Sequence, residues 1–90
     1  DALEAATAFF RHELRGPRGT AARAYLARRG LPEACWDQFG LGYAPESRDA
    51  LRRALESREL PIPLQVEAGL LAEPDEGGTP FDRFRDRIMG

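Results

Sequence analysis

The 90-residue sequence contains no lysine, and it has only one cysteine and one histidine. A single cysteine, Cys35, excludes an internal disulfide framework, and with only His12 beside it no zinc site of the usual Cys/His kind can form. No run of about 18 apolar residues occurs, and the first residues lack the charged-then-apolar layout of a signal peptide. These absences predict a soluble protein of a reducing, cytoplasmic setting that has no contact with a membrane.

The sequence is also poor in features of an enzyme active site. It has no glycine-rich phosphate loop, no Asp-x-Asp motif to hold divalent ions, and no nucleophile beside an obvious base. We interpret His12 as a surface or boundary residue rather than a base, and Cys35 as a small buried or half-buried apolar residue. Catalysis by this chain alone is therefore not expected, and no cofactor is assigned to it.

Composition indicates one small domain with one modest core, since 42% of the residues are hydrophobic and 31% are charged. The chain begins at Asp1 and stops just after the apolar pair Ile88-Met89, which is typical of the opening of a strand. We therefore expect residues 1–90 to be one domain of a longer parent. The predicted fold class is α+β, predominantly helical with a few short strands.

Apolar residues at helical spacing predict an amphipathic helix near the start of the chain, ending at Gly16-Pro17. Its inward stripe consists of Leu3, Ala6, Phe10 and Leu14. A second helix is expected from a Thr20 cap to Gly30, which suits the left-handed position after a helix end, with Leu31 folding back onto Leu26.

Three further elements are predicted in the middle of the chain. Pro32 is expected to begin a short helix with Trp36 and Phe39 in the core and Gly40 at its end. Residues 41–45 are expected to be extended, because they contain a glycine and end in a proline. Ser47 is expected to cap the next helix, in which Asp49 and Arg53 can pair.

From Glu59 to Gly78 the chain carries five acidic residues and no basic one. Nucleic acid should avoid this stretch. Within it the pattern predicts one or two helical turns stopped by Gly69, a strand at residues 70–72, and an exposed turn at residues 74–78.

The closing segment, residues 82–89, places Arg83, Arg85 and Arg87 within five residues of a chain whose net charge is only −2. We favour a helical turn that passes into a strand at Ile88, although strand spacing would also align the three arginines. On either reading at least two guanidinium groups point the same way, which suits a row of phosphates. The alternative is that Asp82 and Asp86 neutralise the arginines on a solvated surface.

Five pieces of the sequence, in this order, resemble the N-terminal subdomain of the catalytic core of bacterial DnaG-type DNA primases. They are Phe9-Phe10-Arg11-His12, Tyr25-Leu26-Ala27-Arg28-Arg29-Gly30-Leu31, Phe39-Gly40-Leu41-Gly42-Tyr43-Ala44-Pro45, Ala68-Gly69-Leu70-Leu71 and Asp82-Arg83-Phe84-Arg85-Asp86-Arg87-Ile88-Met89. Each piece alone is weak, and their order makes the resemblance specific. It covers nearly the whole chain.

The resemblance implies a parent that makes RNA primers for DNA replication. Such a primase has a zinc-binding domain with Zn²⁺, this subdomain, a Toprim fold whose carboxylates hold Mg²⁺ or Mn²⁺, and a helicase-interacting region. The subdomain would supply basic residues to a cleft for single-stranded DNA template and RNA primer, shared with the Toprim domain. Matched residue by residue, the cleft arginines would be Arg29, Arg83, Arg85 and Arg87. The implied partners are these nucleic acids, the Toprim domain and, through the parent, the replicative helicase.

The sequence departs from the family pattern at three places. Gly90 stands where the family usually continues with Phe-Pro-Ile, which would leave the final strand incomplete. Arg48 stands where the family often has tryptophan, and the linker at residues 59–65 is idiosyncratic; neither of these two is expected to touch the cleft. Two other functions stay open: a structural module that braces the Toprim fold, and a helical protein-interaction module that uses the acidic stretch.

Overall fold

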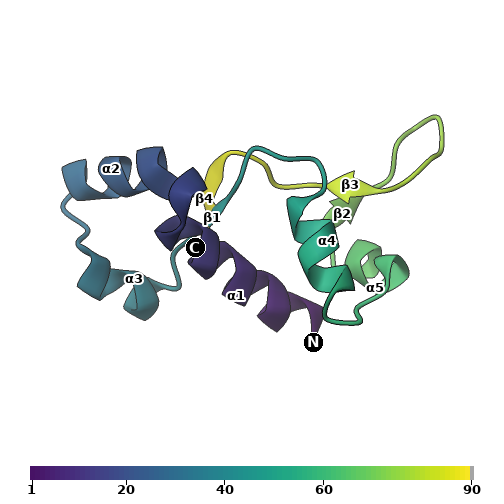
Figure 1. The fold of residues 1–90 in the computed structure, drawn as a ribbon, viewed down its shortest axis with the longest axis horizontal. Coiled ribbons are helices and arrows are strands. Elements are labelled where there is room, and N and C mark those ends of the chain that lie inside the picture. The colour runs from purple at the N-terminus through teal and green to yellow at the C-terminus, as the bar shows by residue number, and fades with distance from the viewer. Residues whose placement is uncertain (90) are drawn as a thin grey trace.

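The computed structural model describes residues 1–89, so the expected effect of Gly90 on the last strand lies outside the described residues. Helix α1 (Ala2–Arg15) runs through the middle of the molecule (Figure 1) and begins where the Asp1 carboxylate accepts the Glu4 N–H at 2.9 Å. It ends at Gly16, as predicted. Phe10 and Leu14 of the predicted stripe are buried, whereas Leu3 is 57% exposed because the face around it lacks a covering element.

A 3-10 turn, η1 (Pro17–Gly19), leads into α2 (Thr20–Arg28). Thr20 is the first residue of the helix rather than its cap, and its hydroxyl donates to the Pro17 carbonyl at 3.0 Å. The end of α2 is as predicted: Gly30 has a φ of +76°, and the Leu31 N–H donates to the Leu26 carbonyl at 2.9 Å. This left-handed residue closes the helix and turns the chain back toward α1.

Helix α3 (Glu33–Phe39) follows with Pro32 just outside it, one residue later than predicted. Trp36 is buried and donates its indole N–H to the Leu31 carbonyl at 3.1 Å. Phe39 is 55% exposed, so its assignment to the core was wrong: α3 is too short to bury two faces, and Trp36 occupies the inward one. Ion pairs from Arg11 and Arg15 to Asp37 tie α1 to α3.

Strand β1 (Gly42–Ala44) crosses α1 at very short distance. A Cβ atom at Gly42 would lie 2.7 Å from the Phe10 Cβ and 3.0 Å from the Arg11 backbone nitrogen. Such distances are incompatible with normal packing, so only glycine allows the strand to lie directly on the helix. The predicted extended segment at residues 41–45 is confirmed, and this packing explains its glycine.

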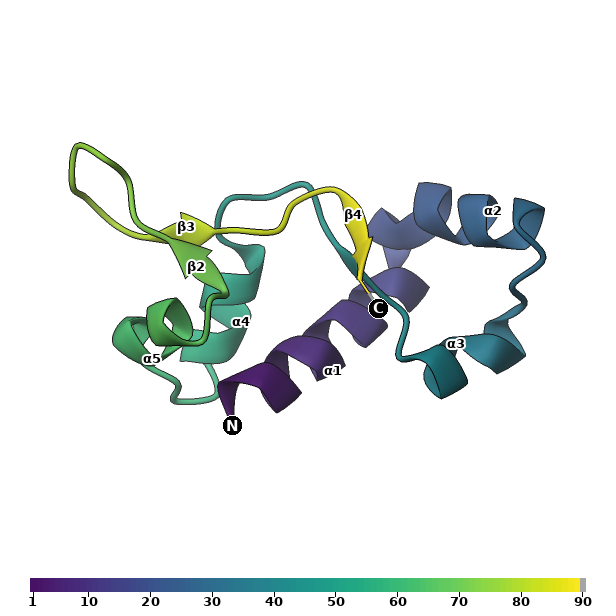
Figure 2. The same cartoon turned by 180° about the vertical axis from the view of Figure 1, so that it is seen from behind.

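Two helices and two antiparallel strand pairs complete the fold. These elements are α4 (Ala50–Glu56), α5 (Ile62–Glu67), β2 (Leu71–Ala72), β3 (Phe81–Asp82) and β4 (Arg87–Met89). Strand β1 pairs with β4, with Tyr43 opposite Ile88, and β2 pairs with β3, with Leu71 opposite Asp82. Figures 1 and 2 show the β2–β3 pair over α4 and α5, with the acidic turn projecting beyond it.

The helical turn expected at the start of the closing segment was wrong. Phe81 and Asp82 are in β3, residues 83–86 form a bend without helix, and β4 begins at Arg87. The strand predicted at Ile88 is confirmed. The helical spacing of the phenylalanines was misleading because pairing with two distant strands, β1 and β2, determines this segment.

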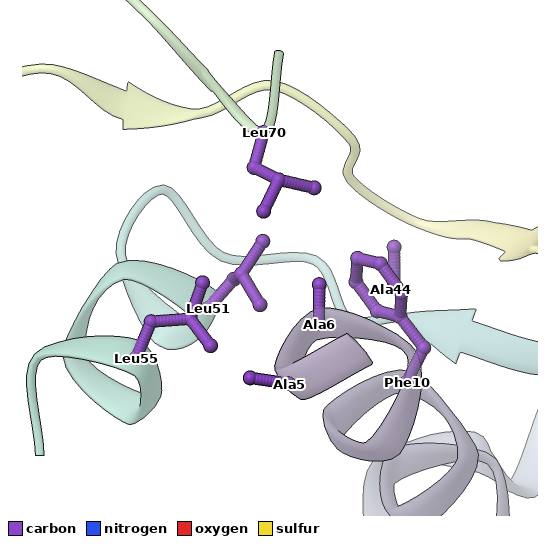
Figure 3. Packing of buried hydrophobic residues seen from close by; sticks show 7 residues of the cluster. All are labelled: Ala5, Ala6, Phe10, Ala44, Leu51, Leu55 and Leu70. Atoms are coloured by element: carbon purple, nitrogen blue, oxygen red, sulfur yellow. The ribbon is translucent and has the colours of Figure 1, made fainter. Parts of the chain in front are cut away.

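The apolar core consists of two clusters that share α1. One joins α1 to β1, α4 and the residue before β2, as Figure 3 shows; its members are Ala5, Ala6, Phe10, Ala44, Leu51, Leu55 and Leu70. The other joins the end of α1 to α2, α3 and β1; its members are Leu14, Ala22, Leu26, Trp36 and Tyr43. The molecule is accordingly elongated, with principal extents of 42 × 25 × 19 Å. The predicted α+β class, mainly helical with short strands, is confirmed.

Candidate nucleic-acid interface

The closing segment is fixed at both ends by strand pairing. Asp82 belongs to β3 and Arg87 to β4, so the chain between them bridges the two sheets (Figure 2). The Asp82 N–H donates to the Arg48 carbonyl at 2.6 Å, and the Arg83 N–H donates to the Leu70 carbonyl at 3.0 Å. The backbone that carries the arginines is therefore held on both sides of the bend.

Asp82 faces inward and caps a helix that lies 30 residues earlier in the chain. Its carboxylate accepts the N–H of Leu51 at 2.8 Å and the N–H of Arg52 at 3.0 Å, and the residue is only 2% exposed. Burial raises the pKa of the Asp82 carboxyl above its ordinary value of 3.8, and the two N–H donors offset part of that rise. Ser47, the predicted cap of α4, accepts the Ala50 N–H at 3.1 Å, so α4 has two capping side chains.

Asp86 is also engaged away from the arginines. It accepts the phenol O–H of Tyr43 at 2.7 Å, and its φ is +51°. This hydrogen bond, followed by burial, raises the pKa of Tyr43 to about 12. The left-handed backbone of Asp86 turns the chain into β4. In β4, Ile88 stands opposite Tyr43 of β1.

The hypothesis that Asp82 and Asp86 neutralise the closing arginines is therefore wrong. Arg83, Arg85 and Arg87 are exposed, and none of them forms an ion pair with a described residue. Their guanidinium groups lie beside two half-buried rings instead. The guanidinium carbons of Arg83 and Arg87 are 5.8 and 5.9 Å from the Phe84 ring centroid, and that of Arg85 is 5.6 Å from the Phe81 ring centroid.

Arg48, which was not expected to touch the cleft, lies against the closing segment. Its guanidinium carbon lies 4.2 Å from the centroid of the Phe81 ring, the same ring that Arg85 approaches. The hydrogen bond from the Asp82 N–H to the Arg48 carbonyl brings the loop before α4 against the closing segment. The replacement of the family's frequent tryptophan was the one signal in the sequence that pointed to this position.

Arg29, the fourth predicted residue, is not brought together with the closing arginines. It follows the last residue of α2, and its guanidinium carbon is 5.8 Å from the ring centroid of the exposed Tyr25. Figure 1 shows that end of α2 at the opposite end of the molecule from β3. A ligand that contacts both places must be a long one.

The exposed side chains of this surface are chemically suited to bind an anion. The guanidinium groups of Arg48 and Arg85 lie beside the Phe81 ring, and those of Arg83 and Arg87 lie beside the Phe84 ring. Arginine donates paired hydrogen bonds to phosphate. Within residues 1–89, no three side chains of His, Cys, Asp or Glu come together as a metal site would require. No helix in that range is both long and apolar enough to cross a membrane.

The sequence is similar to those of known proteins. Residues 9–90 match a family model described as the N-terminal domain of the DNA primase catalytic core. The DNA primase of Pseudomonas putida KT2440 is 44% identical over 88 residues, in a match that covers 97% of this chain and 13% of the relative. The chain therefore spans about an eighth of the length of that curated relative.

Solved structures show the same fold. The RNA polymerase domain of Mycobacterium tuberculosis primase DnaG, in complex with a double-stranded DNA oligomer with a 6-nucleotide overhang, matches with a TM-score of 0.86 and 33% identity, over 97% of this chain and 26% of that one. A DnaG primase catalytic domain bound to ssDNA matches with a TM-score of 0.85 and 30% identity, over 97% of this chain and 28% of that one. The fold is that of part of a bacterial primase catalytic core.

More narrowly, the chain belongs to the family of N-terminal domains of the DNA primase catalytic core.

Proposed function

We propose that this domain holds single-stranded template DNA by its phosphates, for a bacterial DNA primase that synthesises RNA primers. Arg83, Arg85 and Arg87 would be the principal contacts, Arg48 would extend the same surface, and Arg29 would reach a distant part of a long strand. Contact through phosphates implies binding that is largely independent of sequence and sensitive to salt.

One observation carries the proposal. The closing segment contains three exposed arginines and two aspartates, and each aspartate accepts hydrogen bonds from a distant part of the chain: Asp82 from the α4 N-terminus and Asp86 from Tyr43. Within residues 1–89, no ion pair neutralises Arg83, Arg85 or Arg87. Here their positive charge stays available to an external anion.

The bond-forming chemistry would belong to other parts of the parent. Following the family resemblance, a Toprim domain with Mg²⁺ or Mn²⁺ would join the ribonucleotides beside this surface, and a zinc-binding domain and a helicase-interacting region would complete the primase. The task of this chain is then positional: it fixes the phosphates so that the template base reaches the neighbouring active site. The RNA primer, paired to the template, would be the second nucleic-acid partner.

The test is a fluorescence-anisotropy titration of a short labelled single-stranded DNA at two salt concentrations. Contact with about three phosphates predicts a slope of log affinity against log salt of roughly −2. The triple variant Arg83→Ala/Arg85→Ala/Arg87→Ala should lose most of the affinity and most of the slope. A control variant, Arg18→Ala/Arg53→Ala/Arg58→Ala, removes the same charge from exposed positions elsewhere.

Equal binding by the wild-type chain and the closing triple variant would remove these arginines from the interface. Equal loss in both triple variants would attribute binding to net charge rather than to this surface. Circular dichroism establishes beforehand that both variants are folded.

A second candidate function, bracing of a neighbouring domain, is favoured by an apolar groove. The groove has a volume of about 340 Å³ and lies between α1, the residues before β2, and the closing segment; Leu3, Phe10, Leu70, Phe84 and Met89 are among its lining residues. On this alternative, the closing arginines stabilise Phe84 at the rim, and the triple variant melts at lower temperature while DNA affinity is unchanged. Thermal melts beside the titration separate the two functions.

A further inference from the structure

The closing segment contains two acidic and three basic residues, and the structure gives the two kinds different partners. Asp82 is buried and accepts two N–H groups at the start of α4. Asp86 is exposed, as the three arginines are, and its carboxylate accepts the Tyr43 O–H. We propose that Tyr43 and Asp86 are positioning residues, whose hydrogen bond sets Arg85 and Arg87 for contact with phosphates. This inference rests on the proposed function and adds to it two residues that themselves carry no positive charge.

The backbone of Asp86 is the first reason. A φ of +51° is unfavourable for a residue with a side chain, although Asp and Asn tolerate it better than most. The conformation persists because the Tyr43 hydroxyl, fixed in the buried part of β1, holds the carboxylate at 2.7 Å. With this turn in place, Arg85 lies beside Phe81 and Arg87 lies beside Phe84, on two different rings.

Electrostatics supply the second reason. A carboxylate between two arginines repels the phosphate that these arginines would bind, so Asp86 weakens the site by its charge alone. An acid at this position therefore requires a compensating role, and the phenol bond provides it. A guanidinium group that is already held in place loses less conformational freedom when phosphate binds, which lowers the cost of association.

The experiment compares two substitutions that remove the same charge. Asp86→Asn tolerates the left-handed backbone and keeps an oxygen that can accept the Tyr43 O–H, whereas Asp86→Gly tolerates the backbone and has no acceptor. Both are titrated with the labelled single-stranded DNA, in the 90-residue chain. We expect Asp86→Asn to bind at least as tightly as wild type, and Asp86→Gly to bind about threefold to tenfold more weakly than Asp86→Asn.

Tyr43→Phe supplies an independent test, because it deletes only the donor and leaves every charge and the backbone preference of Asp86 intact. We expect Tyr43→Phe to weaken DNA binding by about the same factor that separates Asp86→Gly from Asp86→Asn. In the Asp86→Gly background, Tyr43→Phe should have no further effect on affinity, since the bond is already absent. A purely structural role would instead lower the melting temperature without this pattern in DNA affinity.

Failure of the inference can be told apart from failure of the proposed function. If the closing triple arginine variant loses binding while Asp86→Asn, Asp86→Gly and Tyr43→Phe all bind alike, the positioning role is overturned and the interface stands. If the triple arginine variant binds like wild type, or the wild-type chain does not bind DNA, the proposed function is overturned and the positioning role with it.

Discussion

At the scale of single residues, Tyr43 has a measurable property that reports its bond to Asp86. The hydrogen bond is the largest cause that raises the pKa of Tyr43 from 10.0 to about 12, and burial is the next. In a Tyr25→Phe background, Tyr43 is the one remaining tyrosine. The tyrosinate absorbance should then titrate with a pKa of about 12, and Asp86→Gly should move that pKa down toward 10.0.

The same shift fixes the sign of a pH effect on stability. Folding raises the pKa of the phenol, so the folded protein holds this proton more tightly than the unfolded chain does. The contribution is complete below pH 10 and is lost as the pH rises from about 10 through about 12. A titration of Tyr43 that is identical in the Asp86→Gly variant would contradict the bond.

At the scale of elements, the N-terminus of α4 depends on a residue of β3. Asp82→Ala would leave the N–H groups of Leu51 and Arg52 without their acceptor in a buried place, and we expect a loss of about 2 to 4 kcal/mol in the free energy of unfolding. Urea denaturation measures this loss of unfolding free energy. Asp82→Asn, which keeps one acceptor oxygen, should lose less.

Asp75→Ala is the matched control for that loss, because it removes the same charge from the exposed turn between β2 and β3. Its free energy of unfolding should stay within about 0.5 kcal/mol of wild type. If Asp82→Ala is no less stable than Asp75→Ala, the Asp82 cap of α4 contributes nothing to the free energy of unfolding.

The helices of this domain could be predicted because their signals are local. Gly16-Pro17, Gly30 and Gly40 mark helix ends through the backbone conformations that glycine and proline favour, and the structure places the ends there. The closing segment could not be predicted in this way. Its two strands are defined by partners about 10 and 45 residues upstream, and no local spacing encodes those pairings.

In the candidate site, too, some features could be predicted from local sequence and others depend on distant contacts. The three closing arginines were apparent from their density in the sequence, whereas Arg48 and the internal roles of Asp82 and Asp86 depend on contacts over 30 or more residues. An aspartate that caps a distant helix has the same sequence appearance as one that pairs with its arginine neighbour. The structure alone distinguishes the two.

At the scale of the whole molecule, the elongated shape separates two basic places. The end of α2 that carries Arg29 and the closing segment lie far apart along a molecule 42 Å long (Figure 1). Arg29→Ala should therefore leave the affinity for a short single-stranded oligonucleotide unchanged and weaken that for a longer one. Anisotropy titrations with a series of oligonucleotide lengths measure the difference.

Arg85→Ala is the comparison for that series, since it should weaken binding at every length. Arg58→Ala, another exposed arginine, controls for the loss of one charge. An Arg29→Ala effect of equal size at all lengths would place Arg29 within the same small footprint as the closing arginines.

The pairing of β1 with β4 also has a consequence for synthesis of the chain on the ribosome. Residues 42–44 emerge long before residues 87–89, and at about 5 to 20 residues per second the delay lasts several seconds. Until then β1 has an open edge, and α4 lacks its second capping side chain. The nascent domain thus acquires these two contacts late, and a chaperone that shields this edge during the delay would protect it from aggregation.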